Sequence, residues 1–142
     1  MPTLNAAMNA SASALTAERA RVEVAVSNLA NAESTRGPDG RPYRRRDVVL
    51  ATAPENTFEA AMGRTGAVGV TVAEIVEDQS AFRRRYDPSH PDADEQGFVA
   101  LPNVDTPEEM VNMLSASRAY QANLTAIGLI RDMVQKALDL GR

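Results

Sequence analysis

The last third of the chain, residues 106–140, repeats apolar side chains at a spacing of seven and has no proline after Pro107. The side chains that follow this spacing, or lie three or four positions from it, are Met110, Met113, Tyr120, Leu124, Ile127, Ile130, Val134 and Leu138. A seven-residue apolar repeat is typical of a helix that packs along another helix. At about 1.5 Å per residue, such a helix is roughly 50 Å long and requires a partner of similar length.

Three residues mark the predicted start of this helix. Thr106 can occupy the cap position, Pro107 suits the first helical position, and Glu109 stands three residues after Thr106. This T-x-x-E pattern predicts a capping box, in which the Glu109 side chain returns to the backbone of Thr106.

Residues 3–32 are the predicted partner helix. Met8, Leu15, Val22 and Leu29 repeat the spacing of seven, and the interior has neither proline nor glycine. Because alanine is frequent here, the contact surface is small, and two such helices alone are expected to be marginally stable. Two arrangements are open: a helical hairpin within one chain, and packing against several neighbours in a bundle or helical tube.

The middle of the chain is predicted to be a small β-rich unit. Turn-forming residues gather at 37–42, and short strands are expected at 43–50, 68–76, 82–86 and 97–101. Residues 56–66 show no period and are interpreted as a loop or a single helical turn.

The predicted fold class is therefore mainly α. Long N- and C-terminal helices pack as a coiled-coil-like pair or bundle, with a small middle domain of hairpins. We expect a discontinuous helical assembly domain, 1–33 with 106–142, and an outer β-rich domain, 34–105.

Composition narrows the function classes. The chain has 142 residues, 4% aromatic residues, no cysteine and a net charge of -4. These values disfavour a large compact core and exclude disulfides, thiolate metal sites and a cysteine nucleophile. They give no general attraction to nucleic acid or an anionic membrane. Residues 1–18 contain no lysine or arginine and no continuous apolar run, so neither a secretory signal peptide nor a transmembrane segment is expected.

The segment around the single histidine, His90, invites a metal hypothesis because three aspartates and a glutamate lie within five residues of it. A zinc site would need further histidine or cysteine ligands, and a calcium loop needs a glycine turn and a spaced glutamate. Pro88 and Pro91 flank Ser89 and His90, which favours a rigid surface turn with solvated acidic residues. No metal or cofactor is expected.

Two arginine triplets, 44–46 and 83–85, raise the alternative of a nucleic-acid surface. Neither lies in a helical pattern, and no aromatic interleaving supports base stacking. They are interpreted as solvated strand faces or as partners for acidic residues of a neighbouring subunit. Gly63, Gly66 and Gly69 lack the order of a phosphate-binding loop, and nothing resembles a nucleophile elbow. Neither a small-molecule substrate nor an enzymatic activity is expected.

Residues 27–32, with the sequence SNLANA, close the first predicted helix and are followed by Thr35. This stretch resembles the N-terminal signature shared by flagellar rod and hook proteins. The segments that extend the resemblance to the basal-body rod members of this family are 42–49, 86–94, 103–104, 108–113, 116–123 and 137–142. The resemblance is weakest between residues 51 and 69. Two positions depart from the family: Asp105, where asparagine is frequent, and the basic stretch 82–85.

The resemblance implies a structural subunit of the proximal rod of the bacterial flagellar basal body. Such subunits polymerise with other rod proteins and copies of themselves into a shaft that crosses the periplasm and encloses the export channel. Their terminal helices surround that channel and the smaller domain lies outside. The resemblance further implies no active site, and export by the flagellar type III apparatus without a cleaved signal peptide.

The residues expected at the subunit interface lie on the two terminal helices: Met8, Leu15, Val22, Leu29, Met113, Tyr120, Leu124, Ile127, Val134 and Leu138. The family motif residues are Asn28, Leu29, Ala30 and Asn31. Two alternatives are a secreted or periplasmic helical adaptor, which would stay a defined small oligomer, and a small metal-dependent enzyme built on the His90 segment.

Overall fold

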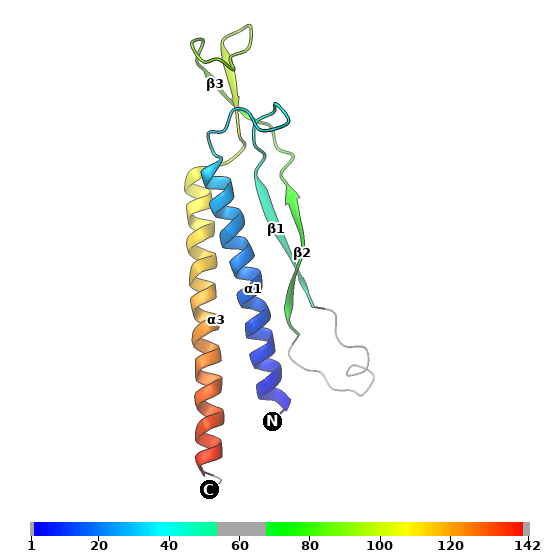
Figure 1. Ribbon diagram of the computed structural model, residues 1–142, viewed down its shortest axis with the longest axis vertical. Coiled ribbons are helices and arrows are strands. Elements are labelled where there is room, and N and C mark those ends of the chain that lie inside the picture. The colour runs from blue at the N-terminus through cyan, green and yellow to red at the C-terminus, as the bar shows by residue number, and fades with distance from the viewer. Residues whose placement is uncertain (1, 54–67, 141–142) are drawn as a thin grey trace. The chain divides into compact units, whose positions relative to one another are not determined.

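The computed structural model describes residues 2–53 and 68–140 (Figure 1). Its elements in chain order are α1 (Pro2–Ala30), β1 (Arg46–Thr52), β2 (Val70–Glu77), β3 (Arg83–Tyr86), β4 (Phe98–Leu101) and α3 (Thr106–Leu140). Two long terminal helices with a small strand-rich middle confirm the predicted fold class. The loop or turn expected at residues 56–66 lies outside the described residues, as do Gly63 and Gly66.

The chain divides into two compact units. Unit 1 comprises Met1–Ala20, Val49–Glu74 and Ser115–Arg142, and unit 2 comprises Arg21–Val48 and Ile75–Leu114. The buried apolar residues described in unit 1 are Ala17, Ala116 and Ile130, and those in unit 2 are Ala25, Ala32, Val99, Leu101 and Val104. Both cores are small, as the low aromatic content suggests.

β1 and β2 pair as a two-stranded sheet. The Ala53 N–H donates to the Gly69 carbonyl (2.8 Å), and the Asp78 N–H donates to the Arg45 carbonyl (2.8 Å). The start of each strand is thus bonded near the end of the other, so the strands are antiparallel.

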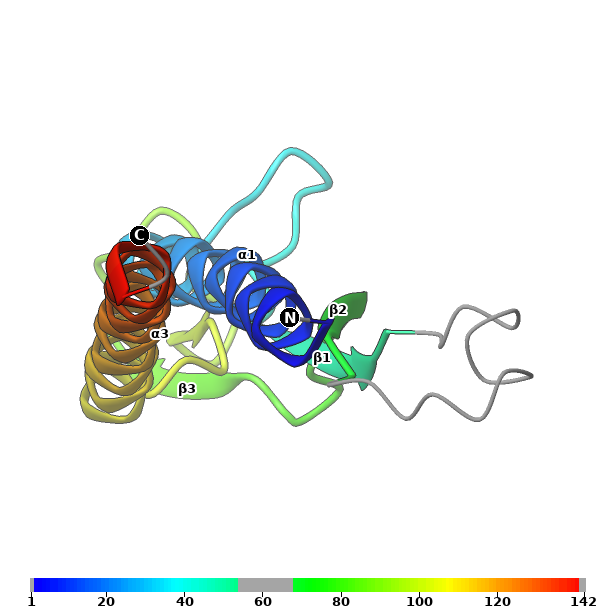
Figure 2. The same ribbon diagram turned by 90° about the horizontal axis from the view of Figure 1, so that it is seen from below.

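In unit 1, the start of β2 lies against the N-terminal part of α1 (Figure 2). The Ser13 hydroxyl accepts a hydrogen bond from the Val70 N–H at 3.0 Å and donates to the Ala10 carbonyl at 2.8 Å. A Cβ atom at Gly69 would lie 2.8 Å from Ser13 Oγ. Glycine at this position therefore permits the close approach of strand and helix.

β3 and β4 form the second antiparallel pair, in which Arg83 faces Leu101 and Tyr86 faces Phe98. Because side chains alternate along a strand, Leu101 and Val99 share one face, and both are buried in unit 2. The loop between the strands ends at Gly97, whose φ of 80° lies in the left-handed region that favours glycine.

α3 has the predicted bounds, but its cap lies one residue earlier than predicted. The Glu109 N–H donates to the Asp105 carbonyl at 3.0 Å, so Asp105 and not Thr106 precedes the first helical residue. The Glu109 carboxylate does not close a capping box. Both its oxygens accept hydrogen bonds from residues far away in the sequence, Arg45 and Asn28.

Candidate functional site

The expected interface residues of α3 are divided between half-buried and exposed positions. Met113, Ile127 and Val134 are half-buried, whereas Leu124 and Leu138 expose 54% and 62% of their surface. Tyr120 lies between these groups at 36%. On α1, Leu15, Val22 and Leu29 are half-buried and Met8 is exposed.

The row of α3 side chains that is most buried within the chain is not the most apolar row on the helix surface. Glu109, Ala116 and Ile130 are buried, and Asn123 on the same row is half-buried. These four positions also repeat every seven residues, but two are polar and one is small. The exposed large apolar side chains of this helix are Met110, Val111, Leu114, Leu124, Leu129, Met133, Leu138 and Leu140. α3 therefore carries a large apolar surface that the described residues of its own chain leave exposed.

Asn28 is the centre of a buried polar cluster in unit 2. Its side-chain Nδ2 donates to the Arg46 carbonyl (2.8 Å) and to Glu109 Oε2 (3.1 Å). Its Oδ1 accepts from the Arg46 N–H (2.9 Å) and the Tyr43 hydroxyl (2.9 Å). Both donors and two acceptor sites of the amide are thus used. The Asn28 amide therefore bonds to both the backbone N–H and the backbone C=O of Arg46, as a residue in a neighbouring strand would.

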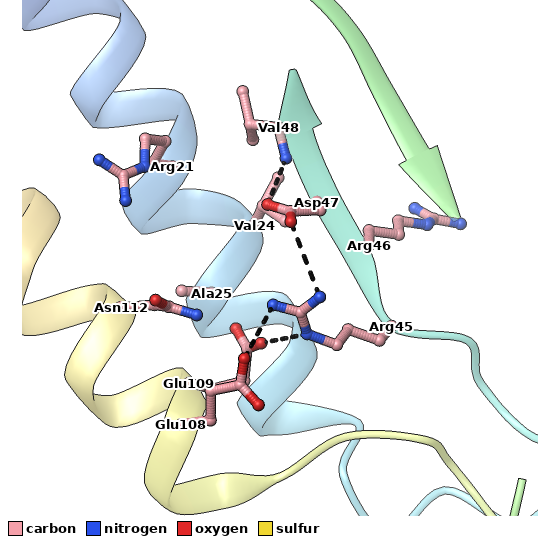
Figure 3. Close-up of a pocket in the computed structure, with 10 residues that line it drawn as sticks. All are labelled: Arg21, Val24, Ala25, Arg45, Arg46, Asp47, Val48, Glu108, Glu109 and Asn112. Carbon is pink, nitrogen blue, oxygen red and sulfur yellow. Dashed lines mark hydrogen bonds and ion pairs between the residues drawn. The ribbon is translucent and has the colours of Figure 1, made fainter. Parts of the chain in front are cut away.

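The Arg45–Glu109 ion pair completes the cluster (Figure 3). Glu109 is 2% exposed, and its Oε1 accepts from Arg45 Nε at 2.6 Å. Figure 3 shows Arg45 reaching from the start of β1 toward the first turn of α3. Burial alone would lower the pKa of Arg45, but the hydrogen bond and charge of Glu109, helped by Asp47 and Glu108, leave that pKa raised. The arginine is therefore charged at every relevant pH.

Asn103 fixes the backbone next to this pair. Its Oδ1 accepts from the Arg45 N–H (2.9 Å), and its Nδ2 donates to the Asp78 carbonyl (3.1 Å) and Ser80 Oγ (2.8 Å). A polar pocket of about 230 Å³ opens beside the cluster and is lined by Arg21, Arg46, Asp47, Glu108 and Asn112 among others (Figure 3).

The rest of the family motif has separate roles. Asn31 donates from Nδ2 to the Ser27 carbonyl (2.8 Å) and accepts from Ser34 Oγ (3.3 Å), which closes the C-terminal end of α1. Leu29 is half-buried and Ala30 is exposed. Of the four motif residues, only Asn28 enters the buried cluster.

The His90 segment forms turns, but its acidic residues are not all solvated as the sequence suggested. Asp92 accepts from Thr35 Oγ1 (2.9 Å) and pairs with Arg36 (2.9 Å), which ties this segment to the loop after α1. His90 Nδ1 accepts from the Asp92 N–H (3.1 Å). In residues 2–53 and 68–140, no group of three histidine, aspartate or glutamate side chains is arranged to hold a metal ion.

The first arginine triplet is also not a solvated strand face. Arg44 stacks on the Phe82 ring at 4.5 Å from its centroid, Arg45 is in the cluster, and Arg46 pairs with Glu77 (3.7 Å). In the second triplet, β3, all three arginines are exposed.

Sequence reasoning singled out Asn28 through the motif, but missed Arg45 and assigned Glu109 to the capping box. The sequence shows that Arg45 and Glu109 carry opposite charges, but no spacing rule connects two positions so far apart. Their pairing could therefore not be found from a local pattern. None of the helices described in the structure is long and apolar enough to span a membrane.

Comparison with known proteins identifies two matching families. Residues 8–38 match the family "Flagella basal body rod protein", and residues 95–140 match "Flagellar basal body rod FlgEFG protein C-terminal". Among individual proteins, the chain is 47% identical over 130 residues to flagellar basal-body rod protein FlgC of Escherichia coli O6:H1, with 92% of both chains covered. It is 43% identical over 145 residues to FlgC of Bacillus subtilis, with 95% of this chain and 96% of the relative covered. FlgC of Borreliella burgdorferi is 40% identical over 149 residues.

Proposed function

Because this chain belongs to the family of flagellar basal-body rod protein FlgC, we propose that its two terminal helices are the surfaces through which it joins the rod. It is a structural subunit of the flagellar basal-body rod and assembles with other rod proteins. This membership replaces the alternative of a helical adaptor.

The observation that carries the proposal is the uncovered apolar surface of α3. Leu129 and Met133 expose 60% and 52% of their surface, although each is a large apolar residue in the middle of a long helix. Burying such a side chain is worth about 1.5–3 kcal/mol. Several of them on one helix supply enough free energy to drive association once neighbouring subunits cover them.

In this proposal, residues 1–33 and 106–142 form the assembly domain and 34–105 form the outer domain. The expected contacts include Met8, Leu124 and Leu138, which are exposed. The partners are copies of this chain and other rod proteins in the proximal rod, which crosses the periplasm and encloses the export channel. The role is structural without catalysis, and the subunit leaves the cytoplasm through the flagellar type III export apparatus without a cleaved signal peptide.

The proposal is tested by placing a charge in the apolar surface. Leu124→Glu is expected to abolish swimming and remove the chain from purified basal bodies, because a buried unpaired carboxylate costs several kcal/mol. The exposed Gln121→Glu on the same helix is the matched control and is expected to assemble normally. The measurements are swimming-zone diameter and the amount of the chain in basal bodies, in cells that lack the native gene.

Folding is monitored separately by circular dichroism of the purified chain. Since Leu124 is exposed, the Leu124→Glu protein should keep the helix content of the unchanged protein. Incorporation of Leu124→Glu into basal bodies at the normal level would show that this part of α3 is not an assembly surface.

A further inference from the structure

The two arginine triplets of unit 2, 44–46 and 83–85, differ in the interactions that their side chains make. Arg44, Arg45 and Arg46 are engaged by an aromatic ring, by Glu109 and by Glu77. Arg83 donates to the Val104 carbonyl at 2.9 Å. For Arg84 and Arg85, the described part of the chain provides neither a hydrogen bond nor an ion pair to the guanidinium group.

The register of the β3–β4 hairpin places Arg84 beside aromatic side chains. Arg84 faces Ala100 and Tyr86 faces Phe98 across the strands, so these four residues share the face opposite the buried Val99 and Leu101. The Tyr86 and Phe98 rings meet edge to face at 5.3 Å between centroids, yet Tyr86 is 65% exposed. Arginine and tyrosine are the residues most enriched at the energetic centres of protein interfaces.

The loop of the same hairpin carries the opposite charge. Residues 87–97 include Asp87, Asp92, Asp94 and Glu95, and no lysine or arginine. Asp92 is held by Arg36. Asp94 and Glu95 are exposed, and Asp94 uses one oxygen, Oδ1, to accept from the Gln96 and Phe98 N–H groups. One short hairpin thus has a basic aromatic face and an acidic loop.

We propose that the Arg84–Tyr86 face of this hairpin binds the acidic loop, at Asp94 and Glu95, of the β3–β4 hairpin in a second copy of this chain. Two different complementary patches on one molecule give a head-to-tail contact, which repeats without closing and builds a helical array. This inference rests on the proposed function, since a rod is such an array. The oppositely charged patches set the register between neighbouring copies, in addition to the apolar contacts of the helices.

A different role for these arginines would be to protect the edge of a two-stranded sheet from pairing with other strands. Charged residues of either sign protect an edge. Reversing the charge therefore separates the two roles, because Arg84→Glu keeps the edge protected but repels an acidic partner.

The first experiment is a charge exchange in cells that lack the native gene. Arg84→Glu is expected to lower the amount of the chain in purified basal bodies about tenfold, because it places a negative charge on the proposed face opposite the acidic loop of the next copy. Adding Glu95→Arg to the same chain should raise the amount of the chain in basal bodies again, by about threefold or more. Arg41→Glu, an exposed arginine in the turn at residues 37–41, is the matched control and should assemble normally. Normal assembly of the Arg84→Glu chain, or no recovery with Glu95→Arg, would overturn the proposal.

The second experiment identifies the partner directly. A photoreactive benzoylphenylalanine in place of Tyr86 keeps an aromatic ring at this position, and irradiated basal bodies should yield an adduct of two copies of this chain joined at residues 87–97. An adduct with another rod protein or with cell-wall glycan, or no adduct from a chain that assembles, would contradict the proposal. If the unchanged chain itself is absent from basal bodies, the proposed function fails instead, and the two failures are distinguished.

Discussion

Replacing Asn28 by alanine should destabilise unit 2 more than any other single truncation in the family motif. The change removes two donated and two accepted hydrogen bonds of 2.8–3.1 Å. A neutral hydrogen bond contributes about 1 kcal/mol, and a bond to a charged group about 1.5–3 kcal/mol. Two backbone bonds and the Glu109 bond therefore give a loss of about 3.5–5 kcal/mol in the free energy of unfolding, with Tyr43 rehydrated at little cost.

Asn28→Asp tests the same cluster with almost no change in shape. The aspartate can still accept from the Arg46 N–H and the Tyr43 hydroxyl, but it has no N–H to donate to the Arg46 carbonyl or to Glu109. It also places a second carboxylate where the Asn28 amide now lies 3.1 Å from Glu109 Oε2. Two carboxylates this close repel each other, so Asn28→Asp should also destabilise unit 2.

The assay is urea unfolding of the purified full chain, followed by circular dichroism and by tyrosine fluorescence, to which Tyr43 contributes from within the cluster. Asn31→Ala is the matched control, because within the described ranges its side chain bonds to Ser27 and Ser34, near the end of the same helix. We expect it to cost about 1 kcal/mol or less. If Asn28→Ala costs no more than Asn31→Ala, the buried amide does not hold unit 2 together.

Three further changes probe other parts of the chain. Gly128→Ala should raise the free energy of unfolding of the isolated chain by about 0.5–1 kcal/mol in urea, because a Cβ there meets no atom within 4 Å and alanine favours the helix. A lower free energy of unfolding would contradict this. Ser80 lowers the pKa of Asp78 through its backbone N–H and its side chain, so this contribution to stability is complete at neutral pH and is lost as the pH falls below about 4. Ser80→Ala should raise the pKa of Asp78 partway toward its ordinary value in an NMR titration. An unchanged pKa would refute the assignment. Glu109→Gln should cost about 2–3 kcal/mol in urea unfolding because Arg45 loses its closest counter-charge. Glu108→Gln, at an exposed position 3.8 Å from Arg45, should cost under about 0.5 kcal/mol, and equal costs would show that the Arg45–Glu109 pair is not important.

The helices and strands were predictable from sequence because their signals are local. The spacing of seven, the scarcity of glycine and proline, and the turn residues at 37–42 are sufficient to place both helices and all four strands within about three residues. The bounds of α3 were predicted as well, but the role of Glu109 was not, for a reason that is not local. Glu109 is bound by Arg45 and Asn28, which are 64 and 81 residues away in the sequence, and these bonds replace the capping box.

The seven-residue apolar period of α3 did not identify the face of the helix that the chain itself buries. It selected Leu124 and Leu138 because it ranks positions by apolar size, but within the chain the buried row contains Ala116, Asn123 and Ile130. A periodic pattern reports every partner that a helix has, and it cannot separate those in the same chain from those in another. The buried cluster was therefore predictable in part: the motif drew attention to Asn28, but neither the motif nor the period indicated Arg45. The helical surfaces stay a prediction.

The β1–β2 sheet has a consequence for how one sequence fits into a shaft with unlike neighbours. Six of the seven β1 residues and five of the eight β2 residues are exposed, so the described parts of the chain pack only lightly against this sheet. A two-stranded ribbon of this kind twists and bends at low cost because few side-chain contacts resist the deformation. Subunits in non-equivalent environments can therefore adjust this ribbon while Asn28 and Ser13 keep its two ends attached to α1, and the helices need not change.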